Sequence, residues 1–172
     1  FKDCTEIVRV TIPDSVTGIR CGAFKNCTSL ESVTIPEGVT SIEYDAFKNC
    51  ASLSEVSIPD SVSYIGHDAF SGCDSRLYDI ETFPALILVD GWIIACERTL
   101  SGDVDLPPVR GIADQAFLGC VSIDSLTVPE GLRFVGYYAF ADCSSLGKVT
   151  IFSKEIRINV SAFEGCAKLR NI

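Results

Sequence analysis

Short runs of alternating apolar and polar residues recur along the chain, and each run ends at a proline. In the clearest runs, an apolar residue is followed by apolar residues three and five positions later, and then by proline. These runs occupy residues 7–13, 30–36, 53–59 and 123–129. Alternation of this kind is typical of a short, half-buried β-strand. Because proline cannot donate a hydrogen bond to a sheet, each strand is predicted to end there.

A second motif, Ala-Phe-x-x-Cys, occurs six times and shows that the chain is built from repeats. Its cysteines are separated by 23 residues in each of two groups: Cys27, Cys50 and Cys73, then Cys120, Cys143 and Cys166. Cys96 lies midway between the groups, and Cys4 extends the series backwards. A 23-residue unit cannot bury its apolar positions alone, so stacked units must share one core. We therefore predict a single solenoid over residues 1–172 with about seven and a half coils.

The combined pattern L-x-x-V-x-I-P-x-x-V-x-x-I-x-x-x-A-F-x-x-C resembles the BspA-like class of leucine-rich repeat, found mainly in bacterial surface proteins. The match covers residues 1–73 and 104–172. The resemblance implies short parallel strands on a concave face and turns or 3₁₀ segments on a convex face. It also implies adhesion or protein binding rather than catalysis, with a host matrix protein as the partner. An exported location, at the cell surface or in the periplasm, is expected on the same ground.

Residues 74–103 depart from the repeat. Two apolar runs within residues 86–96 are joined by Asp90-Gly91, the strongest short signal for a β-hairpin with a type I′ turn. We predict a hairpin insert within one irregular repeat; a domain boundary is the alternative. Trp92 in this hairpin either projects as a binding residue or packs over neighbouring coils, as most tryptophans do.

Composition and charge narrow the classes of partner. The chain is 47% apolar and 22% charged, which is typical of a folded protein, and its formal net charge is −9. An acidic surface repels nucleic acid and anionic membranes, so neither is expected as a partner. The most apolar window is too short and too interrupted to span a bilayer. The sequence lacks methionine, and both ends interrupt a repeat, so we expect a piece of a longer protein or ends that associate with other chains.

Eight of the nine cysteines occupy the same repeat position and are called the cysteine column: Cys4, Cys27, Cys50, Cys73, Cys96, Cys120, Cys143 and Cys166. Adjacent coils place such side chains about 5 Å apart and parallel, farther than a disulfide favours. We predict reduced, buried thiols that hydrogen-bond to the turn backbone. Cys21 lies outside this column at a predicted surface position. No cysteine spacing matches a zinc site, so neither a metal nor a cofactor is expected.

Catalytic groupings are poorly supported. The one histidine, His67, is two coils away from Cys21, about 10 Å and far beyond the reach of a general base. Stacked acidic residues, such as Asp45 and Asp68, are typical of a solvated turn face. No glycine-rich phosphate loop follows a strand. We therefore expect no enzymatic activity in this chain.

The residues between the buried strand positions are the remaining candidates for a binding surface, because they point outwards on the expected concave face of the predicted sheet. They are Arg9, Thr11, Ser32, Thr34, Glu55, Ser57, Ser125, Thr127, Lys148 and Thr150. Solenoids bind proteins through extended faces of this kind. The function we predict is a non-enzymatic protein-binding or adhesion module. The alternative is a structural repeat that self-associates through uncapped ends, or that carries an activity located outside this chain.

Overall fold

The computed structural model describes residues 1–80 and 82–172. The chain divides into two compact units, Phe1–Asp79 and Ile80–Ile172, which are described separately. The prediction of one continuous solenoid stays a prediction.

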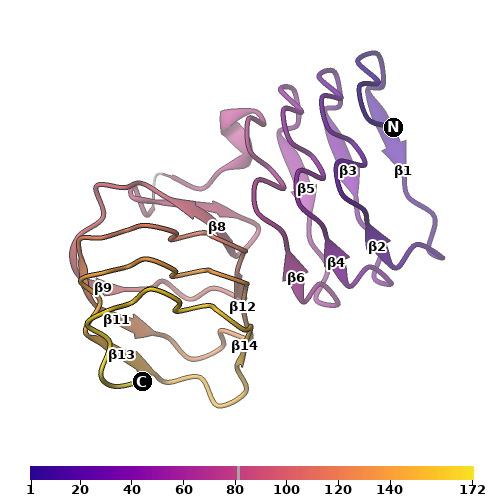
Figure 1. Cartoon of the computed structure of the whole chain (residues 1–172). Coiled ribbons are helices and arrows are strands. Elements are labelled where there is room, and N and C mark those ends of the chain that lie inside the picture. Colours follow the sequence, from indigo (N-terminus) through magenta and orange to yellow (C-terminus); the bar gives the residue numbers. More distant parts are fainter. Residues whose placement is uncertain (81) are drawn as a thin grey trace. The chain divides into compact units, whose positions relative to one another are not determined.

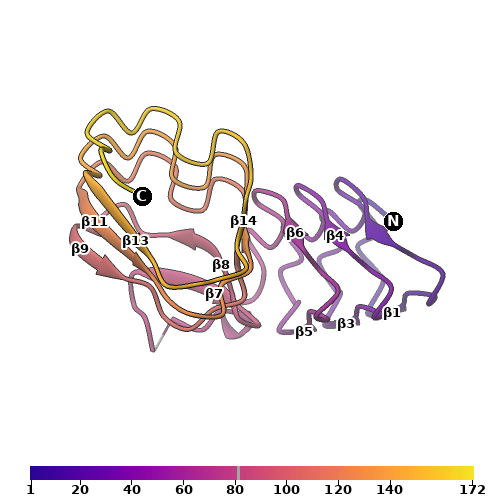
Figure 2. The same cartoon turned by 90° about the horizontal axis from the view of Figure 1, so that it is seen from below.

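The first unit is a stack of coils with two rows of parallel strands (Figures 1 and 2). One row contains β1 (Arg9–Thr11), β3 (Ser32–Thr34) and β5 (Glu55–Ser57). The other row contains β2 (Gly18–Ile19), β4 (Ser41–Ile42) and β6 (Tyr64–Ile65). Each residue pairs with the residue 23 positions later, as Val10 does with Val33. A 3₁₀ turn, η1 (Ser75–Leu77), follows the last coil.

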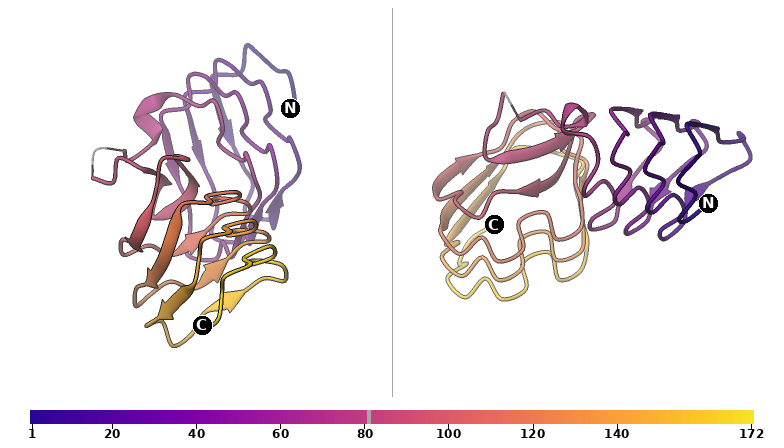
Figure 3. Two further views of the ribbon diagram at one scale, coloured as in Figure 1. Left: turned by 60° about the vertical axis from the view of Figure 1, so that its left-hand side comes forward. Right: turned by 90° about the horizontal axis from the view of Figure 1, so that it is seen from above.

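The second unit has the same construction with one added hairpin (Figure 3). One sheet contains β9 (Gly102–Asp105), β11 (Ile123–Val128) and β13 (Lys148–Ile151). The second sheet has the order β14 (Arg157–Ile158), β12 (Phe134–Val135), β10 (Gly111–Ile112), β8 (Trp92–Cys96) and β7 (Leu86–Val89). Among the strands of the described residues, β7 and β8 alone are antiparallel to each other.

The repeated phenylalanines form stacked ladders inside both units. Phe47 is fully buried and lies between Phe24 and Phe70, with ring centroids 5.2 and 5.3 Å away. Phe140 is held in the same way between Phe117 and Phe163, at 4.7 and 5.2 Å. Because identical positions superpose from coil to coil, each ring packs on its own counterpart. The apolar residues that cannot be buried within one coil are thereby covered by the next.

The turns between the strands also bond from coil to coil. The Phe24 N–H donates to the Ala46 carbonyl at 2.8 Å, and the Asn26 N–H donates to the Lys48 carbonyl at 2.8 Å. Asn26 and Asn49 adopt φ of 61° and 60°, a left-handed conformation that asparagine tolerates better than most residues. The irregular segments therefore satisfy their backbone groups without forming regular secondary structure.

The predicted fold class is confirmed: both units are built from repeating coils with parallel strands. The second row of strands was not predicted. The repeat pattern indicated only that Ile19, Ile42 and Ile65 return to the interior. Because β2, β4 and β6 contain two residues each, no alternation can reveal them.

The hairpin over residues 86–96 is confirmed, and its turn residues Asp90 and Gly91 both have positive φ, 43° and 75°. The prediction of Trp92 as an exposed binding residue is wrong, because its side chain is only 1% exposed. The indole lies against Gly111, where an added Cβ would come within 2.3 Å of the ring, and it stacks on Phe134 at 6.1 Å. The alternative, packing on neighbouring coils, is what the structure shows.

Candidate functional site

The outward face of the β1–β3–β5 sheet is polar and exposed. Arg9, Thr11, Thr34, Glu55 and Ser57 are exposed, and Ser32 is half-buried. The strand register aligns them in two rows: Arg9, Ser32 and Glu55 form one, and Thr11, Thr34 and Ser57 form the other. The first row thus has a cation on one edge strand and an anion on the opposite edge strand.

The matching face of the second unit is the outward side of β9, β11 and β13. Ser125, Thr127 and Thr150 are half-buried there, and Lys148 is exposed. Lys148 is in register with Ser125, and Thr150 with Thr127. All four residues predicted for this face therefore lie on one surface.

The structure adds two residues to this face that the sequence reasoning missed, Asp103 and Asp105. Both are exposed, and they are in register with Ser125 and Thr127. The Ser125 hydroxyl donates to the Asp103 carboxylate at 2.5 Å. The signal was present in the sequence, since the two aspartates flank Val104 as Lys148 and Thr150 flank Val149. The irregular spacing before Val104 concealed it. This face thus has carboxylates on β9 and a lysine on β13.

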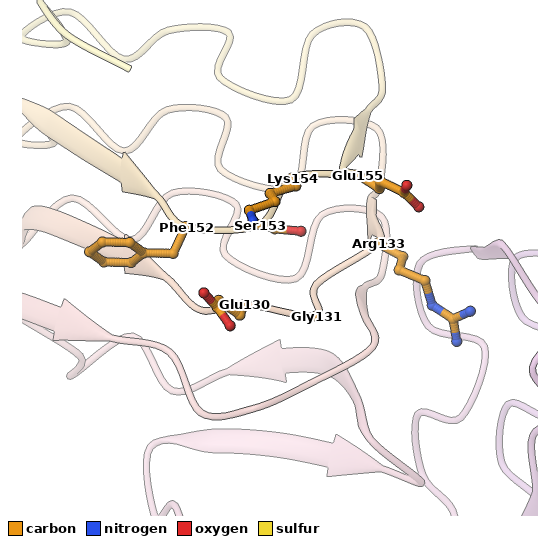
Figure 4. A pocket seen from close by; sticks show the side chains of 7 residues that line it. All are labelled: Glu130, Gly131, Arg133, Phe152, Ser153, Lys154 and Glu155. Carbon is orange, nitrogen blue, oxygen red and sulfur yellow. The ribbon is translucent and has the colours of Figure 1, made fainter.

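A groove of about 520 Å³ lies in the second unit, where the chain passes from one sheet to the other. It is lined by residues that follow β11 and β13: Glu130, Gly131, Arg133, Phe152, Ser153, Lys154 and Glu155. Figure 4 shows Phe152 and Arg133 at opposite ends of this group. The Ser153 hydroxyl donates to the Leu132 carbonyl at 2.6 Å, which ties the two turns together. None of these residues was predicted as a site.

The cysteine column lies inside the coils, and its thiols make a repeated hydrogen bond. The sulfurs of Cys27, Cys50, Cys73, Cys143 and Cys166 each donate to the carbonyl of the phenylalanine 26 residues earlier, at 3.1–3.3 Å. Burial raises the pKa of Cys50, Cys73 and Cys143 to about 12, because the thiolate loses its hydration. These thiols therefore stay protonated at neutral pH, where they act as small apolar side chains with one donor.

The first, fifth and sixth cysteines of the column differ from this pattern. Cys4 lies at the surface side of the column, and its thiol approaches the Lys2 carbonyl at 3.9 Å. Cys96 and Cys120 bond to each other, with their sulfurs 2.8 Å apart. All nine cysteines are free thiols in this structure.

Cys21 is exposed, as expected, but its surroundings do not activate it. Its thiol donates to a Glu43 carboxylate oxygen at 2.9 Å, and this hydrogen bond raises the pKa of Cys21. The same contact lowers the pKa of Glu43, so the proton stays on sulfur. His67 stacks on Tyr44 with ring centroids 5.5 Å apart. The surface around Cys21 therefore favours a protonated thiol rather than a nucleophile.

Within the described residues, no three histidine, cysteine or acidic side chains are grouped in a way that would hold a metal ion. In the same part of the chain, no helix has the length and hydrophobicity needed to cross a membrane.

Comparison with known proteins identifies the family. The model of the BspA type leucine rich repeat region matches residues 1–89 and 98–172 in six copies. The chain belongs to this family, as the repeat pattern indicated. No curated protein matches it.

Among solved structures, the chain is similar to a leucine rich cell surface protein of Faecalibacterium prausnitzii, with 32% identity and a TM-score of 0.54. That match covers 98% of this chain and 48% of the other, so the chain spans about half the length of that protein. It also matches a leucine-rich repeat protein of T. pallidum, at 21% identity and a TM-score of 0.43, over 95% of this chain and 78% of the other. The leucine-rich repeat is in general a non-enzymatic scaffold with bacterial surface proteins among its members.

Proposed function

We propose that this chain is a non-enzymatic, protein-binding module of a bacterial surface or exported protein. The observation that supports it best is the outward face of β9, β11 and β13. There Asp103, Ser125 and Lys148 lie in one cross-strand row, and Asp105, Thr127 and Thr150 lie in the next. Short side chains on a hydrogen-bonded sheet have little freedom to lose when a partner binds.

The charges on this face set what kind of partner it fits. Carboxylates on β9 and a lysine on β13 favour a protein surface that carries a basic group opposite the aspartates and an acidic group opposite Lys148. The Ser and Thr hydroxyls between them donate and accept hydrogen bonds. The face of the first unit, with Arg9 and Glu55 at its edges, supports the same proposal independently. A host matrix protein remains the partner class that we propose.

The location that we propose, the cell surface, rests on family membership and on the similarity to the Faecalibacterium cell surface protein. The alternatives are self-association and an activity outside this chain.

The test is binding of immobilised matrix proteins, such as fibronectin, laminin and collagen, by the purified chain. The variant Asp103→Lys/Asp105→Lys, and separately Lys148→Glu, should each weaken binding about tenfold or more, since like charges then face the partner. Lys168→Glu is the matched control, because Lys168 is exposed on a turn outside the sheet. Equal binding by face variants and control would refute the face as the site. Light scattering across a concentration series would show growing mass if self-association is the true role.

A further inference from the structure

Cys96 and Cys120 are the exception within the cysteine column. Their sulfurs lie 2.8 Å apart and face each other, whereas five other thiols of the column point at backbone carbonyls. The S–S bond of a disulfide is about 2.05 Å long, so the two sulfurs need only a small movement to reach bonding distance.

We propose that Cys96 and Cys120 are a dithiol site that a low-molecular-weight disulfide oxidises to an intramolecular disulfide, while the regular thiols of the column stay reduced.

The local backbone explains why this pair differs. In a regular coil, the cysteine lies eight positions after the inward isoleucine or valine, as Cys120 does after Ile112. In the irregular coil, Ile93 is in register with Ile112, but only three residues lead from Ile93 to Cys96, and they run as the end of β8. The Cys96 side chain therefore projects from an extended strand, whereas a regular column cysteine follows a turn.

The same change removes the usual acceptor of the Cys120 thiol. Cys143 donates to the carbonyl of Phe117, which lies three residues before Cys120 in the preceding coil. The residue three positions before Cys96 is Ile93, which lies in β8 rather than in a turn, and its carbonyl is directed along the sheet to the Ala113 N–H at 2.9 Å. The Cys120 thiol is thus left with the Cys96 sulfur as its partner.

The exposures of the two residues suit a stepwise reaction. Cys120 is buried, whereas Cys96 is half-buried and so is reached first from solvent. The hydrogen bond between the two sulfurs raises the pKa of Cys96 and lowers the pKa of Cys120, and the nearby Arg98 guanidinium also lowers the pKa of Cys120. Once Cys96 is in a mixed disulfide it has no S–H to donate, and the charge of Arg98 is what still favours the Cys120 thiolate in the second step.

The chemistry balances with oxidised glutathione as the oxidant. The pair loses one proton to solvent and Cys120 holds the remaining proton, while the Cys96 sulfur attacks one glutathione sulfur, which breaks the S–S bond and releases one glutathione thiolate. The Cys120 thiolate then attacks the Cys96 sulfur of the mixed disulfide and expels the second thiolate. The protein loses two electrons and two protons, and the oxidant becomes two glutathione thiols after protonation.

The experiment exposes the folded chain to oxidised glutathione and counts thiols after denaturation in acid. Because two of the nine cysteines form the disulfide, we expect seven reactive thiols. The mass of the chain should fall by that of two hydrogen atoms, and dithiothreitol should reverse the change. Trypsin cleaves after Arg76, Arg98, Arg110 and Arg133, so Cys96 and Cys120 each lie alone in their peptides, 77–98 and 111–133. Those two peptides should be linked. Nine thiols after oxidation, or a different linked pair, would overturn the proposal.

Variants separate this pair from the rest of the column. Cys120→Ser should abolish the linked peptides and leave eight thiols, or mixed disulfide on Cys96, under the same oxidation. Cys143→Ser, the matched control from a regular coil, should still form the link. Loss of the link in Cys143→Ser but not in Cys120→Ser would contradict the assignment. Because the wild-type peptide map needs no variant, the test does not depend on either variant folding.

Discussion

Phe117 is the residue whose removal best tests how the coils are held together. Its side chain is fully buried and stacks on Phe140 with ring centroids 4.7 Å apart. Replacing a buried phenylalanine by alanine removes the transfer free energy of the ring and leaves a cavity, at a cost of about 3–5 kcal/mol. The stack itself is worth about 0.5–1.5 kcal/mol of that sum. We therefore expect Phe117→Ala to destabilise the second unit by about 4 kcal/mol.

Urea unfolding measures this effect through Trp92, the chain's one tryptophan, which is buried in the same unit. With a slope of about 2 kcal/mol per M urea, the midpoint of the Trp92 transition should fall by about 2 M. Phe152→Ala is the control, because Phe152 is 56% exposed. Its midpoint should move by no more than about 0.25 M.

Equal midpoints for Phe117→Ala and Phe152→Ala would refute the reasoning, because burial would then not decide the contribution of a ring. If Phe117→Ala does not fold, Phe117→Leu keeps most of the apolar volume and should lower the unfolding free energy by about 1–2 kcal/mol.

Two further predictions concern close backbone approach and thiol chemistry. An added Cβ at Gly136 would come within 2.5 Å of the Asp114 backbone nitrogen, so Gly136→Ala should cost about 1–3 kcal/mol in urea unfolding. Gly147→Ala, with no atom nearer than 3.8 Å, should cost less than about 1 kcal/mol; equal costs would contradict the contact. Glu43→Gln removes the carboxylate that raises the pKa of Cys21, so more thiolate forms at pH 7.5. Alkylation of Cys21 by iodoacetamide, followed on the peptide 21–25, should then accelerate roughly threefold or more, and an unchanged rate would show that Glu43 does not control the thiol.

The parts of the site that could be predicted are those repeated in every coil. Val33 and Val56 are 23 residues apart and adjacent in the sheet, so their flanking residues Ser32 and Glu55 had to share the opposite face. The hairpin was also predictable, because Asp90 and Gly91 suit a local turn that depends on few distant contacts.

The parts that could not be predicted lie where the repeat changes its spacing. Asp103 and Asp105 joined the face of the second unit because β9 pairs with β11 across a register shift. Trp92 was buried by Gly111 and Phe134, which lie 19 and 42 positions later in the chain. Where the 23-residue spacing is interrupted, the burial of a side chain depends on which distant residues cover it.

The sequence by itself determined the coil, because a strict 23-residue period places the same apolar side chains in one column and only stacking can bury them. It thereby determined the family, the strands that end at each proline, and the phenylalanine ladders. The tertiary structure alone decided that a tryptophan is covered, that two aspartates join the polar outward face of β9, β11 and β13, and that two of nine sulfurs meet. Each of these features depends on how neighbouring coils align where one coil differs in length. A periodic sequence pattern predicts the alignment of regular coils but not the alignment at such an interruption.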